Sequence, residues 1–340
     1  MTDVVVQPVF THLLRMTDHR ATFEHADLAE PRREHGYCTD DMARVLIVAT
    51  REPQSTGELN GLAGKALTFL NDAQSYDGTC RNRLNVGGHW TDTPNTEDHW
   101  GRMVWALGTA AAHSSVSMVR RLATIQFERA ANARSPHPRA MAFAAIGAAE
   151  LLGVTPGHAE ARELLVDYAG SLGEPTGDPE WPWPEPRLTY GNAVLAEAMI
   201  AAGVALGDAA LRARGLDLLA WLLDVETCGG HLSPTPVAGR GPKDRQPGFD
   251  QQPIEVASLA DACARAAATD TSPVWPAGIQ SAAAWFHGDN DLGLLMWDPQ
   301  TGAGFDGLHA DRVNLNCGAE STLAVIATLQ QARSFVPVLQ

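Results

Sequence analysis

Apolar residues recur along the chain in two alternating helical patterns, which Gly-, Pro- and Asp-rich segments separate. In the first pattern one face is apolar, as where Leu62, Ala66 and Phe69 fall at helical spacing. In the second pattern nearly every position is apolar, as in residues 193–202. A helix with one apolar face lies at a surface, whereas a helix that is apolar all round lies inside. The alternation therefore predicts outer helices that are each followed by an inner helix.

Six segments carry each pattern. The predicted inner helices span residues 39–51, 97–113, 137–153, 189–206, 251–268 and 317–332. The amphipathic segments before them include residues 6–13, 62–70, 119–123, 164–168, 216–223 and 279–286. Six such hairpins predict an all-α fold, an (α/α)6 toroid with six inner and six outer helices. A linear α-solenoid is the alternative, but its repeats are usually shorter and more uniform. No linker of biased composition divides the chain, so residues 1–340 are expected to form a single domain.

Polar and aromatic residues concentrate in the segments that lead into the predicted inner helices. In a toroid these segments share one end of the barrel, so their side chains should converge on one cleft. Capping by Thr39 and Thr96 explains one short polar residue per helix start, but not the Trp, Tyr, His, Gln and Arg residues beside them. Aromatic faces that stack on sugar rings, with polar groups for the hydroxyls, predict a carbohydrate-binding cleft. The candidate substrate-binding residues are His35, Tyr37, Arg44, His99, Trp100, Arg102, Trp181, Trp183, Glu185, Tyr190, Gln251, Gln252, Asn316 and Glu320.

The run Trp-Pro-Trp-Pro-Glu at residues 181–185 is the best single indicator of a sugar site. Proline stiffens the segment, so Trp181 or Trp183 could be presented as a stacking platform at little entropic cost. The alternative is that these tryptophans only plug the end of the core.

Two of the segments share a short motif. TDDMAR at residues 39–44 and TEDHWGR at residues 96–102 both carry Thr, two acids and a later arginine. This similarity would place Asp41 and Asp98 as neighbours across the cleft, where two carboxylates flank one glycosidic bond. Arg44 or Arg102 could keep one carboxylate ionised while burial protonates the other. A pair of salt-bridged helix caps is the structural alternative.

Other acids face the same predicted end and compete for the catalytic roles. Glu255 and Glu320 lie in otherwise apolar helices, where an unpaired carboxylate is costly, so each needs a partner or a function. Arg44 or Arg187 could be that partner. The candidate catalytic acids are Asp40, Asp41, Glu97, Asp98, Asp250 and Glu255.

Composition excludes several function classes. The formal net charge of −15 repels a phosphate backbone, which argues against a nucleic-acid partner. No apolar run is long enough to cross a bilayer and no secretory signal precedes the first helix, so we expect a cytoplasmic protein without membrane contact. Five cysteines without a CxxC pair argue against a structural zinc site. Asp40 and Asp41 start a DDxxD-like run, but Arg44 at its fifth position would repel a metal, so we expect no metal and no cofactor.

The phrases HGYCTDDMAR, WPWPEPRLTYGNA, FDQQPIE and FDGLHADRVNLNCGAEST resemble those of bacterial six-hairpin (α/α)6 glycosidase-like proteins. More narrowly, they are similar to the mycobacterial methylmannose-polysaccharide hydrolases. That resemblance implies an α-endomannanase that acts on an intracellular, 1,4-linked, partly 3-O-methylated mannan. It does not assign the catalytic pair.

The sequence therefore predicts a glycoside hydrolase that needs no cofactor and cleaves an oligo- or polysaccharide with two carboxylates, with inversion favoured. A sugar isomerase or epimerase on the same toroid, with His35, His99 or His309 as general base, is the second hypothesis. A glycan-binding protein without activity is the third. The sequence leaves open whether the chain forms a homo-oligomer.

Overall fold

The structure is a computed structural model that describes residues 7–174 and 177–335. Twelve α-helices and one short 3-10 turn, η1 (Arg33–His35), follow one another along these residues. The helices are α1 (Thr11–Arg15), α2 (Thr39–Arg51), α3 (Gly57–Ala73), α4 (Asp98–His113), α5 (Ser117–Ala130), α6 (Pro138–Val154), α7 (Ala159–Ser171), α8 (Asn192–Leu206), α9 (Ala209–Val225), α10 (Pro253–Ala267), α11 (Val274–Phe286) and α12 (Ala319–Ser334).

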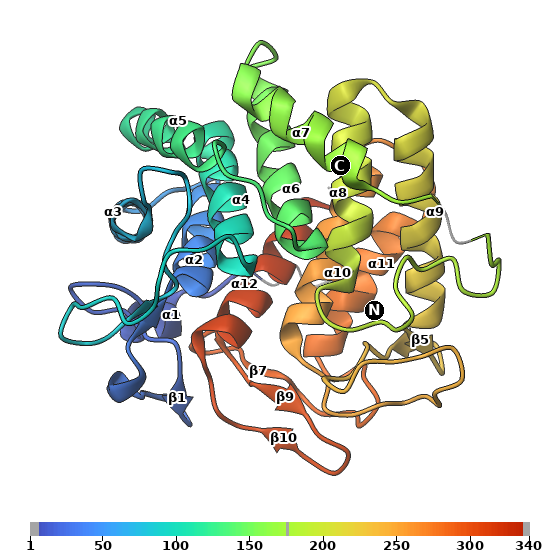
Figure 1. Cartoon of the computed structure of the whole chain (residues 1–340). Coiled ribbons are helices and arrows are strands. Elements are labelled where there is room, and N and C mark those ends of the chain that lie inside the picture. Colours follow the sequence, from blue (N-terminus) through green and yellow to red (C-terminus); the bar gives the residue numbers. More distant parts are fainter. Residues whose placement is uncertain (1–6, 175–176, 336–340) are drawn as a thin grey trace, which may run out of the picture.

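The helices form two concentric layers (Figure 1). The inner helices α2, α4, α6, α8, α10 and α12 each pack against the next one, and α12 closes the ring on α2. The outer helices α3, α5, α7, α9 and α11 each pack against the inner helix that precedes them, and α1 packs against α12. This arrangement is an (α/α)6 toroid, and it confirms the predicted fold class.

The helix bounds differ from the prediction mainly at the first turns. Pro138 and Pro253 occupy the first helical position of α6 and α10, because proline lacks the N–H that a helix leaves unpaired there. Gly191 has a φ of 55° and delays the start of α8 until Asn192. The first outer helix, predicted over residues 6–13, has only five residues and starts at Thr11; Val6 lies outside the described residues.

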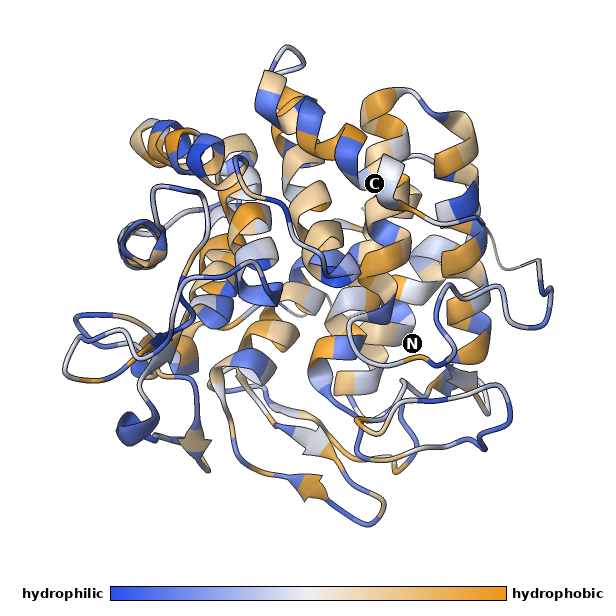
Figure 2. Ribbon diagram, in the orientation of Figure 1, coloured by the Kyte–Doolittle hydropathy of each residue, from blue (hydrophilic) through white to orange (hydrophobic). Residues whose placement is uncertain are grey.

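Small residues allow the inner helices to approach closely. Gly108 of α4 faces Gly147 of α6, and a Cβ added to Gly108 would lie 2.0 Å from the Gly147 carbonyl oxygen. Hydrophobic residues line the helix faces between the two layers, and polar residues gather in the loops and on the outside (Figure 2). The fully buried Trp100, Trp183 and Trp285 are among the largest side chains of this core.

Short two-stranded antiparallel sheets lie in the loops. The strands are β1 (Ala26–Asp27), β2 (Glu30–Pro31), β3 (Tyr37–Cys38), β4 (Arg83–Leu84), β5 (Thr227–Cys228), β6 (His231–Leu232), β7 (Trp297–Asp298), β8 (Ala303–Gly304), β9 (Gly307–Leu308) and β10 (Val313–Asn314). β3 pairs with β4, and each other strand pairs with its sequence neighbour. β3 runs directly into α2, so this pairing fixes where the first inner helix starts. None of the described helices is long and apolar enough to cross a membrane.

Candidate active site

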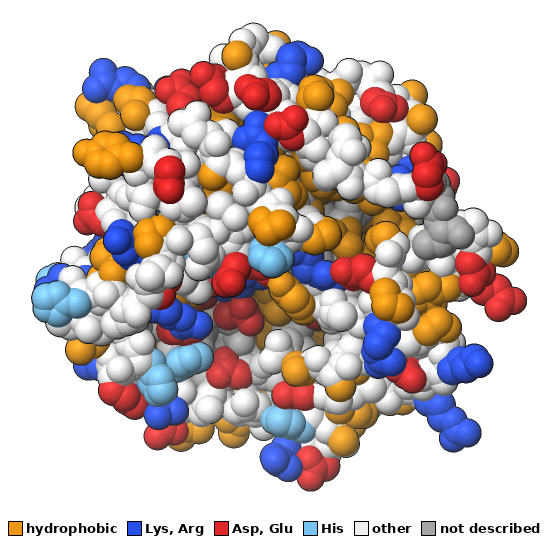
Figure 3. All heavy atoms as spheres, in the orientation of Figure 1, with side chains coloured by type: hydrophobic (Ala, Val, Ile, Leu, Met, Phe, Trp, Pro, Cys, Tyr) orange, Lys and Arg blue, Asp and Glu red, His pale blue; other side chains and the backbone are white. Residues whose placement is uncertain are grey.

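Two adjoining cavities occupy the end of the barrel where the inner helices start. The inner cavity, of about 280 Å³, lies among α2, α4, α6, α8, α10 and α12 and is mostly apolar. The outer cavity, of about 390 Å³, is lined mainly by charged and polar side chains. Arg44, Arg102, Gln252 and Glu320 line both, so the two cavities form one continuous cleft. Figure 3 shows acidic and basic side chains gathered around a hollow near the centre of this face.

Asp40 lies at the start of α2 and is held by two partners. Its Oδ1 accepts a hydrogen bond from Nη1 of Arg102 at 2.8 Å, and its Oδ2 accepts one from the amide of Asn82 at 3.0 Å. Its side chain is 18% exposed, on the wall of the outer cavity. Burial opposes ionisation of this carboxyl, but the charges of Arg102 and Arg44 outweigh it and lower the pKa of Asp40. Asp40 is therefore an ionised carboxylate in the cleft.

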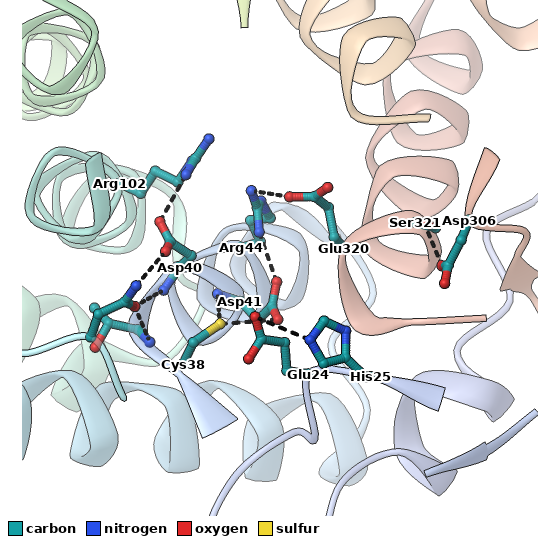
Figure 4. A network of polar contacts seen from close by, with 12 residues as sticks. Glu24, His25, Cys38, Asp40, Asp41, Arg44, Arg102, Asp306, Glu320 and Ser321 are labelled. Atoms are coloured by element: carbon teal, nitrogen blue, oxygen red, sulfur yellow. Dashed lines mark hydrogen bonds and ion pairs between the residues drawn. The ribbon is translucent and has the colours of Figure 1, made fainter. Parts of the chain in front are cut away.

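Asp41 is more deeply buried and belongs to a charged chain (Figure 4). Its Oδ1 accepts from Nη1 of Arg44 at 2.7 Å, and its Oδ2 accepts from the Cys38 thiol at 3.1 Å. Arg44 also donates to Glu320 at 2.6 Å, so this one guanidinium joins the starts of α2 and α12. Burial raises the pKa of Asp41 to about 7. The positive charge of Arg44 offsets only part of this increase, and the negative charge of Glu320 enlarges it.

Glu255, in the first turn of α10, lines the inner cavity and is only 5% exposed. Its carboxylate accepts from the backbone N–H of Gly191 at 2.6 Å and of Asn192 at 3.4 Å, so it binds the unpaired donors at the start of α8. Burial and the nearby Glu226 raise the pKa of Glu255 to about 8, although these N–H groups and Arg139 favour its ionised form. Glu255 is therefore a protonated acid at neutral pH.

Two aromatic residues that the sequence analysis missed line the inner cavity. Trp105 of α4 and Phe143 of α6 stack with their ring centroids 5.8 Å apart and an interplanar angle of 16°. The Arg102 guanidinium lies 4.5 Å from the centroid of Phe143. Both residues lie inside the inner helices rather than before them. The sequence gives one indication of this role, because Phe143 is an aromatic residue in a segment otherwise rich in alanine.

The structure does not bring Asp41 and Asp98 together in one cavity. Asp98 lines neither cavity and accepts a hydrogen bond from the Tyr190 hydroxyl. Tyr190 itself lines the inner cavity. Glu97 is exposed, precedes α4 as its cap residue and lies outside both cavities.

Asp250 lines the outer cavity from the loop before α10. Its Oδ2 is 3.8 Å from Nδ1 of His309, and its buried Oδ1 has no hydrogen-bond partner among the described residues. Burial raises the pKa of Asp250 even though His309 lowers it. Gln252, two residues further on, lines both cavities, and within the described residues no hydrogen-bond partner holds its side-chain amide. The Gln252 amide is therefore available to a ligand, whereas Oδ1 of Asp250 is buried.

Several candidate residues have structural partners instead of cavity positions. Four of these side chains are buried and hydrogen-bonded within the protein. Tyr37 bonds to Asp18, and His99 bonds to Cys80. Trp100 bonds to Gly78 and Ala130, and Gln251 bonds to Gly248 and Asp291. These partners place them in the packed shell behind the cleft. Asn316 accepts from the Leu28 N–H, and His35 lies outside both cavities beside Glu34.

The Trp-Pro-Trp-Pro-Glu run packs against α9 and lines neither cavity. Trp183 is fully buried and stacks on Trp221 at 5.9 Å, and Trp181 meets the same ring edge-on at 5.1 Å. Glu185 forms a two-pronged pair with Arg139, with both N–O distances at 2.7 Å.

One group of side chains near the cleft has the ligand types that bind a metal. Glu24, Cys38 and Asp41 place their ligand atoms within 4.8 Å of one another. Burial raises the pKa of the Cys38 thiol, which keeps it protonated, and Arg83 and Arg44 pair with the two carboxylates. The two arginines therefore already neutralise the carboxylate charges that a metal ion would need.

Several solved structures superimpose on this chain over nearly its whole length. A comparison with protein-family models gave no match, and a comparison with curated protein sequences gave none either. A sugar epimerase from a ruminal bacterium superimposes with a TM-score of 0.71 at 13% identity, over 98% of this chain and 96% of that chain. Cellobiose 2-epimerase from Spirochaeta thermophila gives 0.67 at 14% identity, over 98% and 95%.

An α-mannanase is also among the similar structures. It is an inactive variant of the α-1,6-mannanase GH76A of Salegentibacter sp. HEL1_6, with two consecutive aspartates replaced by alanine, in complex with α-1,6-mannotetrose. It gives a TM-score of 0.62 at 11% identity, over 96% of both chains. The chain therefore shares its (α/α)6 toroid with sugar epimerases, isomerases and α-mannanases.

Proposed function

We propose that the protein is a glycoside hydrolase that cleaves an α-mannan within the chain, with Asp40 as general base and Glu255 as general acid. The observation that carries this proposal is the contrast between two carboxyls in one cleft: Asp40 is paired with Arg102, whereas Glu255 is 5% exposed in the apolar cavity and meets backbone N–H groups. Arg102 and Arg44 outweigh burial and keep Asp40 ionised, whereas burial keeps Glu255 protonated. Paired carboxyls whose environments push their pKa values apart supply the acid and the base of glycoside hydrolysis.

The proposed reaction assigns one step to each residue. Glu255 donates its proton to the glycosidic oxygen as the bond to the anomeric carbon breaks. Asp40 accepts a proton from a water molecule, whose oxygen attacks that carbon from the opposite face. This route inverts the anomeric configuration and needs the carboxyls about 6.5–9.5 Å apart, whereas retention needs about 5–5.5 Å.

The walls of the cleft support a saccharide substrate. The stacked rings of Trp105 and Phe143 offer apolar surface to sugar C–H groups, and Gln252 and Glu320 offer polar groups to hydroxyls. The outer cavity continues the cleft toward solvent, which suits a chain cleaved at an internal bond. The linkage is part of the proposal: the sequence resemblance favours a 1,4-linked, partly methylated mannan, and the similar mannanase structure holds a 1,6-linked oligosaccharide.

The similar mannanase also supports a role for the Asp40–Asp41 pair, because the variant with two consecutive aspartates replaced is inactive. Both aspartates have both oxygens hydrogen-bonded, but the Asp41 side chain is only 3% exposed, against 18% for Asp40. We assign it a positioning role: it holds Arg44, whose charge helps to lower the pKa of Asp40.

A sugar isomerase or epimerase is the second candidate, because proteins with those activities share the fold. The second hypothesis needs a histidine as general base in the cleft. Among the described residues the inner cavity has no histidine in its wall, and the outer cavity has only His25. The candidate base His309 lies 3.8 Å from Asp250 but lines neither cavity. The carboxyls of the cleft therefore favour hydrolysis.

Incubation of the protein with 1,4-linked, methylated 1,4-linked and 1,6-linked α-mannans and with α-glucans tests the proposal. We expect shorter mannan fragments by mass spectrometry and a β-anomer as the first product by NMR. Asp40→Asn and Glu255→Gln should abolish the activity, and Glu97→Gln, outside both cavities, is the matched control. Conversion of a free sugar without change of mass would instead establish the isomerase, and an unchanged rate in Asp40→Asn would remove the assigned pair.

A further inference from the structure

A groove of about 570 Å³ lies outside the barrel, between α3, the loop at residues 18–20 and the hairpin at residues 84–90. Figure 1 shows α3 at the left. Phe69 and Trp90 form an aromatic pair in its wall, edge to face, with ring centroids 5.2 Å apart. Phe69 is buried and holds the partly exposed Trp90 ring in place. No residue of this groove takes part in the proposed reaction.

Hydrogen-bonding groups surround this aromatic pair. His19, Arg20, Lys65, Thr68 and Asp72 line the same groove. Within the described part of the chain, no hydrogen-bond acceptor pairs with the Arg20 guanidinium or the Trp90 indole N–H. Gly88 lets the guanidinium lie against the hairpin, because a Cβ there would be 2.4 Å from Nη1 of Arg20. The groove thus combines a fixed aromatic surface with available donors.

The groove is adjacent to the cleft through β4. Arg83 lines the outer cavity and Leu84 lines the groove, and consecutive residues of a strand point to opposite sides. β4 pairs with β3, which runs into the helix that carries Asp40. The short two-stranded sheet of β3 and β4 therefore separates the groove from the cleft.

We propose that this groove is a second saccharide-binding site, which holds a distant part of the same polysaccharide chain while the cleft acts on another part. Trp90 stacks on a sugar ring, and Arg20 and Asp72 bond to its hydroxyls. Arg20 and Lys65 give the groove two positive charges beside the carboxylate of Asp72, but the overall charge of −15 opposes a polyanionic ligand. The inference rests on the proposed function, because the ligand is the mannan that the cleft is proposed to cleave.

Binding to an Asp40→Asn background, which cannot turn the ligand over, tests the inference. The probes are α-mannan polysaccharide, by electrophoresis in gels that contain it, and α-mannotetraose, by calorimetry. We expect Trp90→Ala to weaken polysaccharide binding about fivefold to tenfold, the size typical of a lost aromatic anchor, and to lower the preference for polysaccharide over tetrasaccharide. Arg20→Ala should weaken polysaccharide binding in the same direction.

Tyr76→Ala is the matched control, because this aromatic side chain is fully exposed and lies outside the groove. Arg20→Ala changes an exposed side chain, so it keeps the test decisive even where Trp90→Ala fails to fold. Polysaccharide binding that is unchanged in both groove variants overturns the second site while leaving the hydrolase intact. If the background protein binds neither saccharide, the proposed function itself fails.

Discussion

Asp40 and Arg102 form an ion pair between the starts of the first two inner helices, with 2.8 Å between Oδ1 and Nη1. The pair joins α2 to α4 directly beside the cleft. Burial alone would raise the pKa of this carboxyl, but the arginines around it outweigh burial and lower its pKa. The pair therefore supplies an ionised base in a partly buried position.

Replacing Asp40 with Asn tests that role most directly. Asn keeps the size of the side chain but cannot accept a proton, so we expect kcat on α-mannan to fall about 10²–10⁴-fold. Thermal unfolding should confirm that the variant stays folded. A folded variant with a kcat within a factor of two of the unsubstituted protein would contradict the assignment.

Replacing Arg102 with Gln should change the pH profile. A general base works while it is ionised, so activity is lost as the pH falls through its pKa. Removing the Arg102 charge raises the pKa of Asp40, and the acidic limb of the kcat/KM profile should move to higher pH. Arg102→Lys keeps a positive charge and should move it less. If the acidic limb lies at the same pH in both variants and in the unsubstituted protein, Arg102 does not set the pKa of the general base.

Glu255 should set the basic limb of the pH profile of kcat/KM. As general acid it must be protonated, so activity should decline as the pH rises through its pKa of about 8. Glu255→Gln should lose about 10²–10⁴-fold on α-mannan but much less on an aryl α-mannoside, whose leaving group needs no proton. Steady-state rates on the two substrates give the comparison. Equal losses on both would assign the acid to another residue.

The fold could be predicted because its cause is local. Helices that are apolar all round alternate with helices that have one apolar face, and that pattern lies within each segment. The first turns were less predictable, because Gly191 and Pro253 shift them by two or three residues. The first outer helix was also shorter than its pattern indicated.

The site was only partly predictable, because long-range contacts decide what each side chain does. The sequence indicated Asp40 and Glu255 as candidates, but only the structure gives them Arg102 and the start of α8 as partners. Asp98 resembles Asp41 in its sequence context, yet its carboxylate accepts a hydrogen bond from Tyr190, which is 92 residues away. No local pattern records such a contact.

Trp183 should affect stability rather than substrate binding. Its side chain is fully buried against Trp221, so Trp183→Ala leaves a large cavity and should cost about 3–5 kcal/mol of unfolding free energy. Urea denaturation measures this loss. Tyr76→Ala, at a fully exposed aromatic, should change the free energy by less than about 0.5 kcal/mol. If Trp183→Ala is stable but has a raised KM, Trp183 binds substrate, as the sequence predicts.

Glu226 provides a test of how burial couples stability to pH. It follows α9, is 1% exposed and accepts hydrogen bonds from the N–H and the hydroxyl of Thr235. Burial raises its pKa to about 7 from an ordinary 4.5, although Thr235 and Arg240 favour the ionised form. Between these two values the folded state binds more protons than the unfolded state, so this residue lowers stability as the pH rises.

Replacing Glu226 with Gln should remove that dependence, because an amide does not titrate. The free energy of unfolding, measured with urea at pH 5 and pH 7.5, should therefore fall less over this range in the variant, by about 2 kcal/mol. Glu58→Gln, at an exposed position on α3, is the matched control and should follow the unsubstituted protein. The same slope in Glu226→Gln and in the control would mean that Glu226 is ionised in the folded protein throughout this range.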